Sequence, residues 1–124
     1  MGTMKVNGYE IKPGASLLYA DLQDANLYEA NLSEADLQGA DLRRADLYNA
    51  NLSEADLQDA NLSNALLFKS NLKGANFQGA NLQGANLTDA NLQGTILSPD
   101  MIWKFSKELS KAKNLDKVVL KVQQ

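Results

Sequence analysis

Residues Leu27–Gly39 read LYEANLSEADLQG, and residues Leu47–Asp59 read LYNANLSEADLQD. Eleven of these thirteen positions are identical when the chain is compared with itself at a lag of twenty residues. Internal similarity at a fixed spacing is typical of repeat architectures, in which each structural unit stacks on the next. The two stretches therefore predict a structure in which equivalent positions lie twenty residues apart.

A shorter period of five residues runs through these stretches and extends well beyond them. Between Ala15 and Pro99 there are 17 consecutive five-residue units, of which 16 are centred on Leu and one on Phe77. Ala usually stands two residues before the centre and Asn or Asp one residue before it, so the unit is Ala-(Asn/Asp)-Leu-x-x. The exceptions are Ser70 and Thr95 in the Ala slot, and Ser16, Leu66 and Ile96 in the Asn/Asp slot.

A period of five fits neither a helix nor a single long strand. On a helix, successive Leu residues would lie about 140° apart around the axis. On a strand, an odd period would turn each Leu to the opposite face. Within one unit, however, Ala and Leu are two residues apart and point the same way if the backbone is extended. A chain that turns in one sense after each unit keeps both side chains inside a coil.

The outward-facing residues predict that each coil has four sides. Tyr28, Tyr48 and Phe68 follow one another at a lag of twenty, whereas a lag of fifteen would place Tyr28 beside Arg43. Leu centres would fill a narrow bore, and the small Ala side chains would fit beside them. Because stacked strands lie about 4.8 Å apart, a little over four coils would make a solenoid of about 20 Å.

The run from Ala15 to Pro99 resembles the pentapeptide-repeat family, whose consensus is A(D/N)Lxx, over 85 of the 124 residues. The resemblance implies an all-β solenoid, namely a right-handed quadrilateral β-helix. It also implies kinship with bacterial and especially cyanobacterial proteins, most of which have no assigned biochemical activity. A minority of the family resemble DNA in shape and charge and bind type II topoisomerases.

The segments that flank the repeats are predicted to close the two ends of the solenoid, because an open end exposes apolar side chains and strand edges. Residues 1–14 are predicted to form a capping strand or loop, since Val6, Tyr9 and Ile11 alternate along it. Residues 15–99 form the repeat domain, and residues 100–124 are predicted to form a helical cap. Ser98 is expected to be the N-cap of the first helix, with Pro99 at its first position.

Helical spacing places one apolar face on this C-terminal segment and leaves Trp103 off it. For residues 115–123 the spacing favours a second short helix, but the β-branched residues also permit a strand. The residues of the predicted apolar face are Met101, Ile102, Phe105, Leu109 and Ala112.

The composition excludes several classes of site. The chain has no Cys and no His, so it lacks a thiolate nucleophile and the commonest general base and metal ligand. We therefore expect a protein that is not an enzyme and that has no catalytic, cofactor or metal site. No apolar run approaches the length of a membrane helix, and the N-terminal residues lack the apolar core of a secretory signal. We expect a cytoplasmic monomer that does not bind membranes.

Charge is unevenly distributed along the chain. Residues 15–99 carry 11 acids and 4 bases, whereas residues 100–124 carry 3 acids and 6 lysines. An acidic body argues against binding to nucleic acid. Most of the acids, including Asp36 and Asp56, occupy the consensus Asn/Asp slot, where repeat structure alone explains them. Asp36 and Asp56 would be neighbours on adjacent coils, and a weakly held cation between them is the alternative.

Outward-facing residues give the candidate binding surface. Tyr28, Tyr48 and Phe68 would stack as an aromatic column, and Leu66 would extend it into an apolar patch. The simpler alternative is that these residues stabilise the solenoid by local packing. The full candidate surface is Tyr28, Tyr48, Leu66, Phe68, Asp36 and Asp56.

These features favour a non-catalytic structural or interaction module with an unidentified protein partner. The alternative is a DNA-mimicking regulator or inhibitor of a type II topoisomerase (gyrase). The family resemblance supports this alternative, as does the acidity of residues 15–64, which carry 10 acids and 2 bases. The short solenoid argues against it, because about 20 Å corresponds to only about six base pairs.

Overall fold

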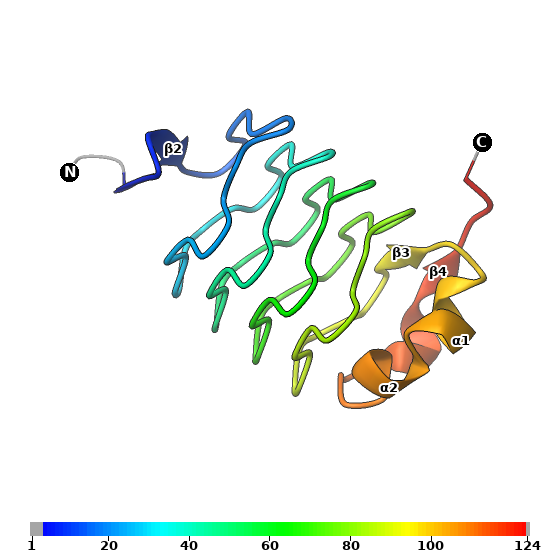
Figure 1. Cartoon of the computed structure of the whole chain (residues 1–124). Coiled ribbons are helices and arrows are strands. Elements are labelled where there is room, and N and C mark those ends of the chain that lie inside the picture. The colour runs from blue at the N-terminus through cyan, green and yellow to red at the C-terminus, as the bar shows by residue number, and fades with distance from the viewer. Residues whose placement is uncertain (1–3, 124) are drawn as a thin grey trace.

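Backbone hydrogen bonds join residues that lie one coil apart. Thirteen short parallel bridges connect positions twenty residues apart, from Ser16–Asp36 to Asn76–Ile96. In the middle of the repeat, the Leu57 N–H donates to the Asn76 carbonyl oxygen at 2.7 Å. The predicted coil of twenty residues is confirmed, and the chain forms a right-handed quadrilateral β-helix. The computed structural model describes residues 4–123 and is shown in Figure 1.

Each coil contributes one five-residue unit to each of four sides. We number the sides by the residues at their centres. Side 1 is centred on Leu17, Leu37, Leu57, Phe77 and Leu97; side 2 on Leu22, Leu42, Leu62 and Leu82; side 3 on Leu27, Leu47, Leu67 and Leu87; and side 4 on Leu32, Leu52, Leu72 and Leu92. Sides 1 and 3 are opposite each other, as are sides 2 and 4.

A tight turn at each corner changes the direction of the chain. The Ala60 N–H donates to the Leu57 carbonyl oxygen at 3.1 Å, and the residue before Ala60, Asp59, has a φ of 59°. A positive φ at this position is typical of a type II turn. The last slot of the unit adopts these unusual dihedral angles, and the consensus Asn/Asp slot does not. The Asn/Asp side chain instead accepts a backbone hydrogen bond within its own unit, as Asp56 accepts the Gln58 N–H at 3.1 Å.

The core is a continuous column of Leu and Ala side chains inside the coils. All 17 unit centres are buried, and so are the residues in the Ala slot, including Ser70 and Thr95. These two polar residues donate their hydroxyls to the carbonyl oxygens of Leu67 and Leu72, both at 2.7 Å. Because a buried hydroxyl is tolerated when it is hydrogen-bonded, both exceptions to the repeat fit the core.

A β-hairpin closes the N-terminal end of the bore. Strands β1 (Met4–Val6) and β2 (Tyr9–Ile11) are antiparallel and are joined by Asn7 and Gly8. These two turn residues have positive φ angles of 52° and 85°, as a two-residue hairpin turn requires. Ile11 is buried, and Val6 and Tyr9 pack against the core.

Two short helices lie against the last coil, α1 (Met101–Lys104) and α2 (Ser106–Leu109). Phe105 interrupts the predicted single helix because its backbone leaves the helical region, with a φ of −115° and a ψ of 30°. Met101, Phe105 and Leu109 are buried, Ile102 and Ala112 are half-buried, and Trp103 is exposed. The predicted apolar face is therefore present. The N-cap is Asp100, so the prediction of Ser98 was wrong; Ser98 is buried in the preceding turn.

The last segment completes the solenoid as a strand. A 3-10 turn, η1 (Leu115–Lys117), leads to β4 (Val119–Leu120), which pairs in parallel with β3 (Ile96–Leu97). The favoured second helix over residues 115–123 was therefore wrong. Pairing with β3 satisfies the edge of the last coil on side 1, which a helix could not do. Among residues 4–123, neither helix is long or apolar enough to span a membrane.

Candidate functional site

Three aromatic side chains form a column on side 3. The ring centroids of Tyr28 and Tyr48 are 5.2 Å apart, with an angle of 17° between the ring planes. Those of Tyr48 and Phe68 are 5.3 Å apart, with an angle of 25°. Each ring follows a buried Leu by one residue, so the outward direction of that slot and the twenty-residue coil together place them in register. The aromatic column predicted from the sequence is present.

A second column on side 3 runs beside the aromatic column and contains Leu66. Backbone bridges connect Asp46 to Leu66 and Leu66 to Asn86, all in the slot before the buried Leu. Leu66 is 45% exposed, although its slot elsewhere holds mainly Asn or Asp. A shallow groove, which we call the side 3 groove, lies between the two columns. Its lining residues are Tyr28, Asp46, Tyr48, Leu66, Phe68 and Asn86.

Sequence reasoning identified four of these lining residues and missed Asp46 and Asn86. The repeat contains the signal that finds them, because both lie twenty residues from Leu66. They add a carboxylate and an amide to walls that are otherwise formed by aromatic and aliphatic side chains. The Asp46 carboxylate accepts the Tyr48 N–H at 3.0 Å through Oδ1, which leaves Oδ2 without a role in that contact. The groove thus combines aromatic and aliphatic surface with one half-buried carboxylate.

The structure does not bring Asp36 and Asp56 together with this groove. Both lie on side 1, on the opposite face of the solenoid, where a backbone bridge makes them neighbours. Their Oδ1 atoms accept the N–H groups of Gln38 and Gln58, each at 3.1 Å. Over residues 4–123 there is no cluster of three or more acidic side chains that could hold a metal ion. The observed contacts therefore fit the structural role of the Asn/Asp slot.

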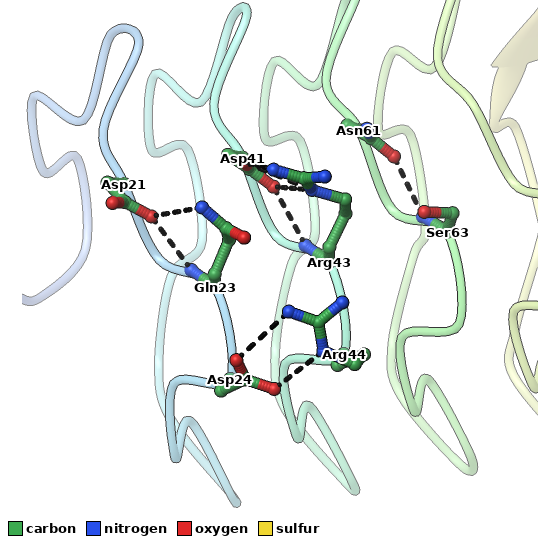
Figure 2. Close-up of polar contacts among 8 residues, drawn as sticks. All are labelled: Asp21, Gln23, Asp24, Asp41, Arg43, Arg44, Asn61 and Ser63. Carbon is green, nitrogen blue, oxygen red and sulfur yellow. Dashed lines mark hydrogen bonds and ion pairs between the residues drawn. The ribbon is translucent and has the colours of Figure 1, made fainter.

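Side 2 shows how that slot is used and where the two arginines of the chain lie (Figure 2). Asp21 and Asn61 each accept the N–H of the residue two positions later, at 3.3 and 3.1 Å. Asp41 does the same and also binds the Arg43 guanidinium at 2.7 Å. Arg44 reaches one coil back to Asp24, with Nε 2.8 Å from the carboxylate. Both arginines are thus neutralised by carboxylates on the same side.

These ion pairs change the ionisation of the four groups. The hydrogen bond from Arg44 holds the pKa of Asp24 below its ordinary value of 3.8, and the hydrogen bond from Arg43 does the same for the pKa of Asp41. Each arginine in turn has a raised pKa because of its hydrogen bond to the carboxylate. A carboxylate with a lowered pKa in the folded state stabilises the fold above its ordinary pKa. That contribution is lost as the pH falls through the folded-state value.

We expect the double variant Arg43→Gln and Arg44→Gln to melt at a slightly lower temperature than the native chain at pH 7. The difference should shrink as the pH falls below 3.8 and be lost once both partner carboxylates are protonated in the folded chain. The effect should be small because the pairs are exposed to solvent. Thermal unfolding followed by circular dichroism from pH 2 to pH 7 measures it.

The matched control is Lys73→Gln with Lys117→Gln, which removes two positive charges that form no ion pair among residues 4–123. Because the body of the solenoid is acidic, both double variants change the general charge equally. A difference that does not shrink as the pH falls toward the acid end of this range, or that is equal in the two double variants, would contradict the role of the ion pairs.

The repeat region matches the model of a known protein family. The family is described as pentapeptide repeats, and eight copies are matched over residues 14–44, 30–68 and 60–98. These ranges together cover more than half of the chain. No curated protein sequence matches the chain significantly.

The solved structures that resemble this one include two pentapeptide repeat proteins. HetL, a pentapeptide repeat protein involved in regulating heterocyst differentiation in the cyanobacterium Nostoc sp. strain PCC 7120, is 45% identical with a TM-score of 0.58. The similarity covers 70% of this chain but 41% of HetL, so the chain spans about two fifths of HetL. A pentapeptide repeat protein from the thylakoid lumen of Arabidopsis thaliana is 34% identical with a TM-score of 0.55. There the similarity covers 84% of this chain and 76% of the plant protein.

Proposed function

Since the chain belongs to the pentapeptide-repeat family, we propose that it is a non-catalytic module that binds a partner protein through the side 3 groove. The observation that carries this proposal is the exposed Leu66 beside a stacked aromatic column. Exposed apolar surface that gathers in one place is typical of interaction sites. Aromatic residues are enriched at the centres of such sites.

The contrast with the rest of the solenoid supports this choice of surface. On side 2 and side 4 the Asn/Asp slot is occupied in every coil by Asn or Asp. Those side chains accept backbone N–H groups within their own unit, so their role in the fold is clear. Leu66 makes no such hydrogen bond, because it has no side-chain acceptor. Leu in this slot therefore lacks a local stabilising contact that Asn or Asp would make. This loss is consistent with a role for Leu66 in binding and not in stabilising the fold.

The chemistry of the groove indicates the kind of segment that it binds. Leu66 and the aromatic side chains provide contact for an aliphatic or aromatic side chain of the partner. Asp46 lies on the same wall, and residues 15–99 carry 11 acids against 4 bases. Charge complementarity therefore favours Lys or Arg next to the apolar residue of the partner. The proposed occupant is an apolar and basic segment of another protein.

The substitution Leu66→Asn tests the proposal because it restores the repeat consensus and removes the apolar wall. The matched control is Leu18→Asn, since Leu18 is 49% exposed on side 1. The native chain and both variants are used to capture proteins from the source cells, and any captured protein is purified and titrated. We expect Leu66→Asn to weaken binding of that partner at least tenfold, whereas Leu18→Asn leaves its affinity unchanged.

Tenfold corresponds to about 1.4 kcal/mol, which is typical for truncation of a central interface residue. Equal losses in the two variants, or no loss in either, would reject the side 3 groove as the binding surface. Measurement of the melting temperature of each variant separates a loss of binding from a loss of fold.

The DNA-mimic alternative predicts a different result. Part of the acidity that motivates it is neutralised, since Asp24 and Asp41 pair with the two arginines. We expect no inhibition of gyrase in a DNA-supercoiling assay at micromolar protein. Potent inhibition that is lost in the double variant Asp36→Lys and Asp56→Lys would favour the DNA-mimic function instead.

A further inference from the structure

The two ends of the solenoid are closed to different extents. At the C-terminal end, the N–H groups of Asp89, Leu92 and Gly94 donate to carbonyl oxygens of residues 111–117. Strand β4 pairs with the last coil on side 1. At the N-terminal end, the hairpin plugs the bore, and its polar contacts reach Asp21 on side 2. The Gly14 N–H also donates to the Ser33 carbonyl oxygen at 2.8 Å.

These contacts leave part of the first coil without a neighbouring strand. In later coils, the N–H of the Asn/Asp slot donates to the preceding coil, as Asp46 does to Ala25 at 2.9 Å. The corresponding N–H groups of Asn26 and Asn31 have no hydrogen-bond partner in residues 4–123, and neither do the carbonyl oxygens of Asn26, Tyr28 and Asn31. We call the backbone from Asn26 to Asn31, on sides 3 and 4, the open rim.

The exposure of side chains along the solenoid also indicates that no strand covers the open rim. Asn26 and Asn31 are exposed, whereas their counterparts one coil later, Asp46 and Asn51, are half-buried. Likewise Tyr28 is exposed and Tyr48 is half-buried. The difference arises because residues of the second coil are covered by the following coil on one side and by the preceding coil on the other. The open rim lacks the second cover.

The aromatic column also ends at this rim. Tyr48 stacks on one face of the Tyr28 ring, and no second ring stacks on its other face within residues 4–123. Two carboxylates, Glu29 and Glu34, occupy the exposed last slots of the two units that form the rim. The rim therefore combines unpaired strand groups, one uncovered aromatic face and negative charge.

We propose that the open rim binds an extended, basic segment of another protein as an additional strand. The segment would donate to and accept from the unpaired backbone groups of Asn26, Tyr28 and Asn31, in the manner of strand addition to a sheet edge. An aromatic residue in the segment would continue the column on Tyr28. Lys or Arg in the segment would face Glu29 and Glu34.

Charge argues for this occupant over a second copy of the chain that pairs rim to rim. Two rims brought together would place Glu29 and Glu34 of one copy near the same residues of the other. Like charges at close range disfavour such pairing, whereas a basic segment is attracted. The two arginines do not offset the acids around the rim, because both already pair with Asp24 and Asp41, and Lys12 pairs with Glu10.

A peptide that copies one half-coil tests the proposal. The probe is a synthetic peptide with the sequence of residues 25–34 in which Glu29→Lys and Glu34→Lys are introduced, and the control peptide is the unaltered copy. Each is titrated into the full chain, and the backbone amide signals are followed by nuclear magnetic resonance. We expect the basic peptide to shift the signals of Asn26, Tyr28 and Asn31 and to bind at least tenfold more tightly than the acidic copy.

Variants of the chain give the matched controls. Glu29→Gln with Glu34→Gln, and separately Tyr28→Ala, are expected to weaken binding of the basic peptide at least fivefold. Tyr19→Ala, which truncates a ring that is 75% exposed on side 1 of the same coil, should leave binding unchanged. Leu66→Asn should also leave it unchanged, which separates the open rim from the side 3 groove.

Three outcomes would overturn the proposal. One is equal affinity for the two peptides. Another is a set of shifted signals at β4 or around Leu66 in place of the rim. The third is the absence of any shift at millimolar peptide while the amide spectrum shows that the chain is folded. Sedimentation of the chain alone gives a fourth such outcome, because self-association of the native chain that Tyr28→Ala abolishes would assign the rim to a second copy.

Discussion

Leu57→Ala is expected to lower the free energy of unfolding by about 2–5 kcal/mol, as large-to-small substitutions in closely packed cores do. Leu57 lies at the centre of side 1 in the middle of the solenoid and has no exposed surface. Coils lie above and below it, so the surrounding backbone is held by hydrogen bonds on both sides and cannot collapse easily into the cavity. Chemical denaturation monitored by circular dichroism measures the change.

The neighbouring substitution Gln58→Ala is the control. Gln58 faces outward, and its side chain donates to the Asp56 carboxylate at 3.1 Å. Loss of this partly exposed contact should lower the free energy of unfolding by less than about 1 kcal/mol. Similar losses for Leu57→Ala and Gln58→Ala would show that the inward and outward slots of the repeat are assigned incorrectly.

We expect the intact chain to be a monomer and deletion of residues 100–124 to produce dimers or aggregates. The segment buries Met101, Phe105 and Leu109 against the last coil, and burial of such side chains contributes about 1.5–3 kcal/mol each before the entropy of ordering is subtracted. It also provides acceptors for the edge of that coil; the Glu108 carboxylate accepts the Gly84 N–H at 2.8 Å. Without the segment, both the apolar bore and the strand edge are exposed, which promotes association.

Light scattering coupled to gel filtration measures the association state of the intact and truncated chains. Phe105→Ala should increase association to a smaller extent, since it removes one buried side chain from the cap and leaves strand β4 in place. The rival role for this basic segment is dimerisation. An intact chain that runs as a dimer and becomes a stable monomer on truncation would contradict the capping role.

The repeat made the columns on each side predictable. Because every unit has five residues and no unit is interrupted, the number of a residue in the chain gives its side and its slot. The sequence was therefore sufficient to place Tyr28, Tyr48 and Phe68 in one column. The same reasoning places Asp36 on side 1, away from the groove, and places Asp46 in it.

The ends of the solenoid were less predictable because the repeat does not extend into them. Val119 and Leu120 pair with Ile96 and Leu97, more than twenty residues earlier, and local helical spacing gives no sign of such a contact. The incorrect prediction of Ser98 as the N-cap also arose where the repeat ends. The helix begins only after a further turn, in which Ser98 is buried. The position of the open rim depends on which sides of the first coil the N-terminal hairpin contacts. The short sequence of the hairpin does not determine those contacts.

The coil of twenty residues underlies both the side 3 groove and the open rim, and paired cysteines test it most directly. The chain has no native Cys, so an introduced pair can react only within itself or with another molecule. Adjacent coils are separated by about 4.8 Å, which lies within the range of Cα separations that a disulfide spans. In dilute solution, Tyr28→Cys with Tyr48→Cys should oxidise rapidly to an intramolecular disulfide, whereas Tyr28→Cys with Arg43→Cys should not. Preferential oxidation of the second pair would contradict the four-sided coil and, with it, both proposed surfaces.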